Sequence, residues 1–116
     1  MYSLIREDLE MTPGKIASQA GHAFVGAVTK SSSDILSEYH KEMPSSPGTK
    51  ICLKVPNLPQ LYRVENECKE AGIPTFVVVD SGCENFFGGK PIVTALGIGP
   101  VTKQQIQHIT KELKLL

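Results

Sequence analysis

The spacing of hydrophobic and polar residues along this chain alternates between the period of a helix and that of a strand, a pattern typical of an α/β fold. Apolar side chains recur at helical spacing over 16–27, 61–71 and 106–113, and a shorter helix is predicted over 34–42. Apolar runs bounded by Pro, Gly and polar turns predict the strands 3–10, 50–55, 73–82 and 92–99. We therefore predict one domain, residues 1–116, with a mixed sheet of about four strands and helices on both faces.

Several residues are typical of the ends of these elements. Thr12 is a plausible N-cap with Pro13 at the first helical position, Asp34 is the cap candidate of the short helix, and Gly72 suits the C′ position. The last helix is predicted to run to the end of the chain with Leu113 inward. The expected core of the sheet is Phe76, Val77, Val78, Leu96 and Ile98. The continuous apolar run 76–79 predicts a strand covered on both faces.

Three polar residues are expected to meet at one edge of the sheet. Ligands of open α/β sheets bind beyond the carboxyl ends of parallel strands, where Lys15 follows the first strand and Asp80 ends the third. The link 81–91 is too short for a crossover helix, so the fourth strand is antiparallel and brings Thr94 back to that edge. Considered separately, Lys15 reads as an exposed lysine, Asp80 as a turn residue and Thr94 as a β-branched residue common in strands. Their expected convergence favours a binding or catalytic site.

The first long helix also carries polar residues at helical spacing. Lys15, Gln19 and His22 share one face, which Gly26 continues. A lysine in the first turn is opposed by the helix dipole, typically by about 0.3–1 kcal/mol. This face is either the polar wall of a groove with an ammonium at its mouth, or the outside of an ordinary amphipathic helix with a histidine at the surface or in the core.

Composition argues against several classes of protein. Twelve basic and twelve acidic residues balance, whereas nucleic-acid-binding domains are often strongly basic, although this balance is compatible with a local basic patch. The three cysteines form no CxxC and no zinc spacing with histidine, so we expect no metal, no cofactor and no structural disulfide. The charged N-terminus is unlike a signal peptide, and no apolar run reaches membrane-spanning length. A cytoplasmic location is therefore expected.

Three segments resemble one known family. "DLEMTPGKIASQAGHA" (8–23), "KEAGIPTFVVVDSG" (69–82) and "TALGIGPVTKQQIQHITKELKLL" (94–116) resemble the archaeal and eukaryotic type of peptidyl-tRNA hydrolase, in the same order and over nearly the whole chain. The resemblance implies hydrolysis of the ester bond of peptidyl-tRNA, an N-acyl-aminoacyl-tRNA, and a possible homodimer. It places the catalytic residues at Lys15, Asp80 and Thr94, with Gln19 and His22 as supports.

The loop after Asp80 departs from that family's pattern. Cys83 stands where the family has arginine, and Glu84 stands where it has a second active-site threonine. A glutamate here would repel a substrate phosphate and raise the pKa of Asp80. The missing arginine would weaken tRNA binding, for which Lys90, in a loop two residues longer than the family's, would compensate. The alternative function is a protein of the same fold that binds a partner or small ligand with no hydrolysis or an altered activity. A thiol-based redox role for Cys83 is a third, weaker hypothesis.

Overall fold

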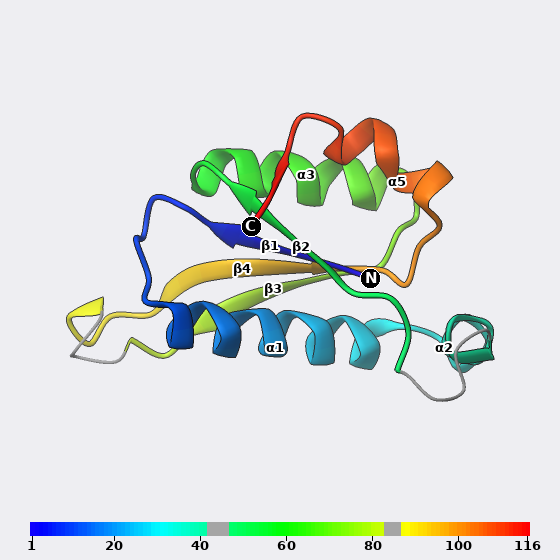
Figure 1. The fold of residues 1–116 in the computed structure, drawn as a ribbon, viewed down its shortest axis with the longest axis horizontal. Helices are drawn as coiled ribbons and strands as arrows, with labels where there is room; N and C mark the ends of the chain where they lie inside the picture. The colour runs from blue at the N-terminus through cyan, green and yellow to red at the C-terminus, as the bar shows by residue number, and fades with distance from the viewer. Residues whose placement is uncertain (42–46, 83–86) are drawn as a thin grey trace.

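A five-stranded mixed sheet forms the centre of the protein, between helices on its two faces (Figure 1). The computed structural model describes residues 1–41, 47–82 and 87–116. The strand order is β3-β4-β1-β2-β5, so β3 and β5 form the edges. The strands are β1 (Tyr2–Arg6), β2 (Ile51–Val55), β3 (Thr75–Asp80), β4 (Ile92–Ile98) and β5 (Lys114–Leu115).

The strand directions confirm the predicted topology. β1 pairs parallel with β2, and β4 pairs antiparallel with both β1 and β3. β3 therefore runs parallel to β1, and the carboxyl ends of both strands lie at the edge where β4 begins. Lys15, Asp80 and Thr94 consequently belong to segments that meet at one end of the sheet.

Helices cover both faces, as predicted. α1 lies along one face, while α3 and α5 lie on the other, and α2 lies beyond the end of the sheet at which β1 begins (Figure 1). Among the described helices, none is long and apolar enough to cross a membrane. Their bounds are α1 (Pro13–Lys30), α2 (Ser33–Lys41), α3 (Leu58–Glu70) and α5 (Lys103–Thr110).

The core has one layer on each side of the sheet. The larger layer packs α3 and α5 onto the sheet, and the smaller packs α1 through small side chains such as Ala20 and Ala23. Of the predicted core residues, Val78, Leu96 and Ile98 are buried, and Phe76 and Val77 are partly buried against these layers. The largest fully buried apolar side chains are Leu4, Ile5, Leu61, Leu96, Ile98 and Ile106.

Element ends follow their predicted caps with one exception. The Thr12 hydroxyl accepts a backbone hydrogen bond at the start of α1, and Gly72 has the positive φ (73°) of a C′ glycine after α3. The prediction for Asp34 is wrong: α2 begins at Ser33, and the Ser32 hydroxyl accepts the N–H of Ile35. Asp34 instead lies in the first turn, where its charge still complements the helix dipole.

The end of the chain differs from the prediction of a continuous helix. α5 stops at Thr110, and Lys114–Leu115 adds a short fifth strand antiparallel to β2. An unpaired edge of β2 would expose backbone N–H and C=O groups, which this strand satisfies. Leu113 packs against the core from the connecting turn, so its predicted inward direction is confirmed.

Two predicted strands are also shorter or less covered than expected. The first ends at Arg6 rather than continuing to Glu10, whose φ of 49° belongs to the turn before α1. β3 is an edge strand, and Val79 is 59% exposed. The prediction that the run Phe76–Val79 is covered on both faces is therefore wrong at Val79, which lies beyond the two core layers.

Candidate active site

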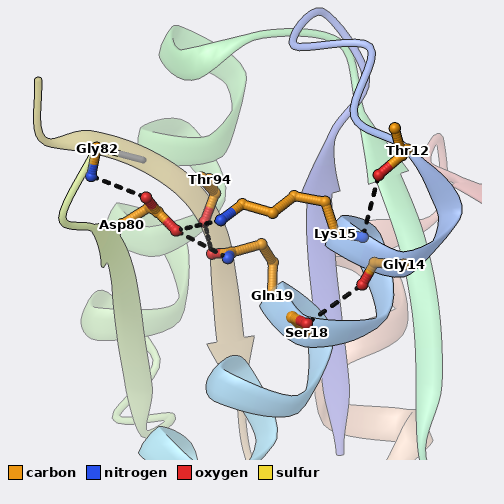
Figure 2. A network of polar contacts seen from close by, with 8 residues as sticks. All are labelled: Thr12, Gly14, Lys15, Ser18, Gln19, Asp80, Gly82 and Thr94. Carbon is orange, nitrogen blue, oxygen red and sulfur yellow. Dashed lines mark hydrogen bonds and ion pairs between the residues drawn. The ribbon is translucent and has the colours of Figure 1, made fainter. Parts of the chain in front are cut away.

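Lys15 and Asp80 form an ion pair between α1 and the end of β3. Lys15 Nζ lies 2.7 Å from Asp80 Oδ2, and the two side chains are 15% and 12% exposed (Figure 2). The predicted convergence of these residues is confirmed. The alternative of Lys15 as an exposed surface lysine is wrong, because the side chain turns from the first turn of α1 toward the sheet. Asp80 thus supplies the negative charge that offsets the unfavourable end of the helix dipole.

Gln19 links this ion pair to β4. Its Nε2 donates to Asp80 Oδ2 over 3.1 Å, and its Oε1 accepts a short hydrogen bond from the hydroxyl of Thr94 (Figure 2). Gln19 is 1% exposed and Thr94 is fully buried. Because the ionised Asp80 carboxylate can only accept hydrogen bonds, the NH₂ group of Gln19 faces it, and the hydroxyl of Thr94 donates to the amide oxygen at the other end. Thr94 therefore reaches the carboxylate through Gln19.

A β-bulge accounts for the direction of the Thr94 side chain. Val78 pairs with Ala95 and Val79 pairs with Val93, which leaves Thr94 as an extra residue on β4. Such an insertion bends the strand and redirects a side chain. Ala95 packs on the α1 side and Thr94 bonds to Gln19 of α1, so two successive residues face the same helix. The bulge thereby places a hydroxyl in the site.

The turn after β3 holds the second oxygen of the carboxylate. The backbone N–H of Gly82 donates to Asp80 Oδ1 over 2.8 Å. Gly82 has a φ of 91°, and a Cβ there would overlap the backbone of Lys90, so the turn needs glycine. Asp80 is thus both a turn former and a site residue, and three donors from two segments fix its orientation.

Two further residues at this edge were missed by the sequence analysis. The Phe87 ring lies over the Lys15 ammonium, with 5.4 Å between Nζ and the ring centroid, a cation–π contact. The Arg6 guanidinium donates to the backbone carbonyl of Val93 over 2.9 Å and also pairs with Asp8, which holds the pKa of Asp8 below its usual range. Phe87 could have been suspected as an aromatic residue in a glycine-rich loop, but Arg6 carried no recognisable signal.

Two of the other candidate residues, His22 and Lys90, lie at the surface and make no hydrogen bond to Lys15, Gln19, Asp80 or Thr94 in the described part of the chain. His22 is exposed on α1, whereas Gln19 and Gly26 are buried against the sheet, so the predicted polar face does not form one wall. The Lys90 side chain is exposed at the end of the loop. Glu84 and Cys83 lie outside the described residues. Among the residues that the structure describes, no cluster of three or more His, Cys, Asp or Glu could hold a metal ion.

Comparison with known proteins gives a match over the whole chain. A family model described as "Peptidyl-tRNA hydrolase PTH2" matches residues 1–116. The chain is 36% identical to the peptidyl-tRNA hydrolase of Methanothermobacter thermautotrophicus, over 97% of this chain and 96% of that protein. It is 37% identical to the peptidyl-tRNA hydrolase of Sulfolobus acidocaldarius, over 100% of this chain and 98% of that protein. A "probable peptidyl-tRNA hydrolase 2" of Dictyostelium discoideum is 36% identical over 97% of this chain and 52% of its own length.

Proposed function

The chain belongs to the PTH2 family of peptidyl-tRNA hydrolases, and we propose that its Lys15–Asp80 site hydrolyses the ester bond of peptidyl-tRNA. The reaction releases the peptide and a free tRNA. The observation that supports this assignment best is the 2.7 Å ion pair, held at the edge of the sheet and oriented by the amide of Gln19. In this proposal residues 1–116 act as one hydrolase domain without a cofactor.

Ester hydrolysis needs an oriented water molecule and a stabilised oxyanion, and the two charged residues suit these roles. The Asp80 carboxylate orients the water and takes its proton as the water attacks the ester carbonyl. The Lys15 ammonium, at the positive end of α1, stabilises the negative charge that develops on the carbonyl oxygen. When the tetrahedral intermediate collapses, the proton passes to the 3′ oxygen of the departing tRNA.

The other candidate residues have supporting roles in this proposal. Gln19 and Thr94 orient the carboxylate, while the Phe87 ring contacts the ammonium. The exposed side chains of His22 and Lys90 contact the substrate, whereas the negative charge of Glu84 opposes the binding of its phosphates. A cytoplasmic location, expected from the cysteine pattern and the charged N-terminus, remains a prediction. A homodimer, implied by the family resemblance, also remains a prediction.

An N-acylated aminoacyl-tRNA incubated with the purified chain tests the proposed function. We expect acid gel electrophoresis to show loss of the acyl group and accumulation of free tRNA. A tRNA that keeps its acyl group in the acid gel but migrates with the protein in a native gel would contradict hydrolysis. That result would favour the alternative of a binding protein with the same fold.

Thr94→Ala is expected to lower kcat by roughly tenfold, or about 1.4 kcal/mol, because it leaves the buried Gln19 oxygen without its donor. Since Thr94 acts through Gln19, the same substitution in a Gln19→Ala background is expected to have almost no further effect. Steady-state kinetics of the two single variants and the double variant measure this coupling. Thr94→Ser, which keeps the hydroxyl, is the matched control. Independent, multiplicative losses would show that Thr94 does not act through Gln19.

Glu84→Thr is expected to tighten tRNA binding by removing a charge that repels the phosphate backbone. Because electrostatic repulsion is screened by salt, the gain is expected to be larger at about 50 mM than at about 200 mM salt. Filter binding of uncharged tRNA at the two salt concentrations measures it. Equal dissociation constants for wild type and variant at both concentrations would exclude repulsion by Glu84.

A further inference from the structure

α1 and β4 approach each other at Gly97 as closely as their backbones allow. A Cβ on Gly97 would overlap the carbonyl oxygen of Ala23 and would lie 2.8 Å from its carbonyl carbon and 3.3 Å from its Cα. These are backbone atoms in the middle of a helix, so no change of rotamer can make room for a methyl group. Any side chain at position 97 must therefore push α1 away from the sheet.

Ala23 and Gln19 are one turn apart on the same face of α1, and both are buried against the sheet. From that face the amide of Gln19 reaches Asp80 on β3 and Thr94 on β4 simultaneously. Hydrogen bonds are made only within a few tenths of an ångström of their optimal length. The distance between α1 and the sheet at Ala23 therefore determines whether Gln19 can bridge the two strands.

We propose that Gly97 is a positioning residue of the site. Because it lacks a side chain, α1 can lie close to the sheet, and this distance determines the contacts of Gln19 with Asp80 and Thr94. Gly97 touches neither the carboxylate nor the ammonium and acts through the helix. Its effect on reaction rates rests on the proposed hydrolase function. Its effect on the contacts of Gln19 does not, so the two can be tested separately.

Two other glycines of α1 provide matched controls. The three atoms nearest to a Cβ on Gly26 would all belong to the ring of Phe76, a side chain that can turn, and a Cβ on Gly21 would meet nothing within 4 Å. Gly26→Ala thus disturbs packing between helix and sheet first at a side chain rather than at the backbone, and Gly21→Ala changes only helix propensity. Neither is expected to change kcat per folded molecule by more than about twofold.

Gly97→Ala is expected to lower kcat for peptidyl-tRNA by roughly 10- to 100-fold with little change in KM, because misplacing a catalytic group by about 1 Å can reduce the rate this much. Adding Gln19→Ala to Gly97→Ala should have little further effect, since the contacts of Gln19 are already lost. Wild-type kcat in Gly97→Ala, or independent losses from the two substitutions, would overturn the proposal. An inactive wild type would contradict the proposed function instead.

The side-chain amide resonances of Gln19 in an NMR spectrum test the positioning without any substrate. They are expected to lie apart from those of exposed glutamines in wild type, Gly21→Ala and Gly26→Ala, and to move among them in Gly97→Ala. Unchanged Gln19 resonances in a folded Gly97→Ala protein would overturn the proposal. If Gly97→Ala does not fold, the spectrum is recorded for Gly21→Ala/Gly97→Ala, in which the helix is stabilised. Failure of both to fold would also contradict the proposal, because one methyl group would then abolish the fold rather than displace a helix.

Discussion

Lys15→Ala is expected to lower kcat for peptidyl-tRNA hydrolysis by roughly 10²- to 10³-fold, the loss that follows removal of one stabiliser of an oxyanion. The ammonium lies 2.7 Å from Asp80 at the amino end of α1, where the helix dipole adds to its positive field. Removing it takes away a charge that acts mainly on the transition state, so KM should change much less than kcat. Steady-state kinetics over a range of substrate concentrations measure both.

Two variants control for charge and for shape at Lys15. Lys30→Ala removes the same charge from the last turn of the same helix and is expected to retain wild-type kcat. Lys15→Arg keeps the charge but replaces a compact ammonium with a planar fork, so it should remain impaired. Because the Lys15 side chain is only 15% exposed, circular dichroism must show that each variant is folded. Equal losses in Lys15→Ala and Lys30→Ala would mean that only overall charge matters.

Asp80→Asn is expected to lower kcat by at least about 10²-fold, the usual contribution of a positioned general base. The amide has almost the same shape, and its oxygen can still accept the hydrogen bond from the N–H of Gly82. It loses the negative charge that orients water and pairs with Lys15. Single-turnover rates of wild type and Asp80→Asn, at a pH where both are folded, measure the loss of the chemical step.

The alternative role of Asp80, as a turn former alone, predicts a different result. Asp80→Asn would then be nearly as active as wild type, since asparagine suits the same turn. The thermal midpoint provides a second comparison and is expected to fall, because the substitution removes the negative charge that lies 2.7 Å from the partly buried Lys15 ammonium. A large loss of rate without unfolding at the assay temperature identifies Asp80 as a catalytic residue.

The meeting of Lys15 and Asp80 could be predicted because it depends only on strand direction. A lysine after the first strand and an aspartate at the end of the third share an edge whenever those strands are parallel, and the short link before β4 requires an antiparallel return. The caps at Thr12 and Gly72 were equally accessible, since each depends on a few neighbouring residues. The same local reasoning selected Gln19, although its bridge to Thr94 needed the tertiary structure.

Features that depend on distant pairing could not be read from the sequence. Simple alternation places Thr94 on the same face as Leu96 and Ile98, and only the bulge opposite Val78 and Val79 turns it toward α1. The strand at Lys114–Leu115 forms because the edge of β2 is available for pairing. The residues next to Lys114 and Leu115 in the sequence do not reveal that this distant edge is available.

The Phe87 contact likewise depends on a loop folding back over the site. The exposure of His22 also follows from the way in which α1 rotates to present its small side chains to the sheet, rather than from the spacing of its polar residues.

The most direct test of the account is the release of free tRNA from peptidyl-tRNA, compared between the wild-type chain and the Lys15→Ala/Asp80→Asn double variant at equal concentrations of folded protein. We expect rapid release by wild type and release at least about 10²- to 10³-fold slower by the double variant. Because the two residues act as one unit, the double variant should lose little more than the more impaired single variant. Equal rates of release by wild type and double variant would place the hydrolytic site elsewhere and contradict the account.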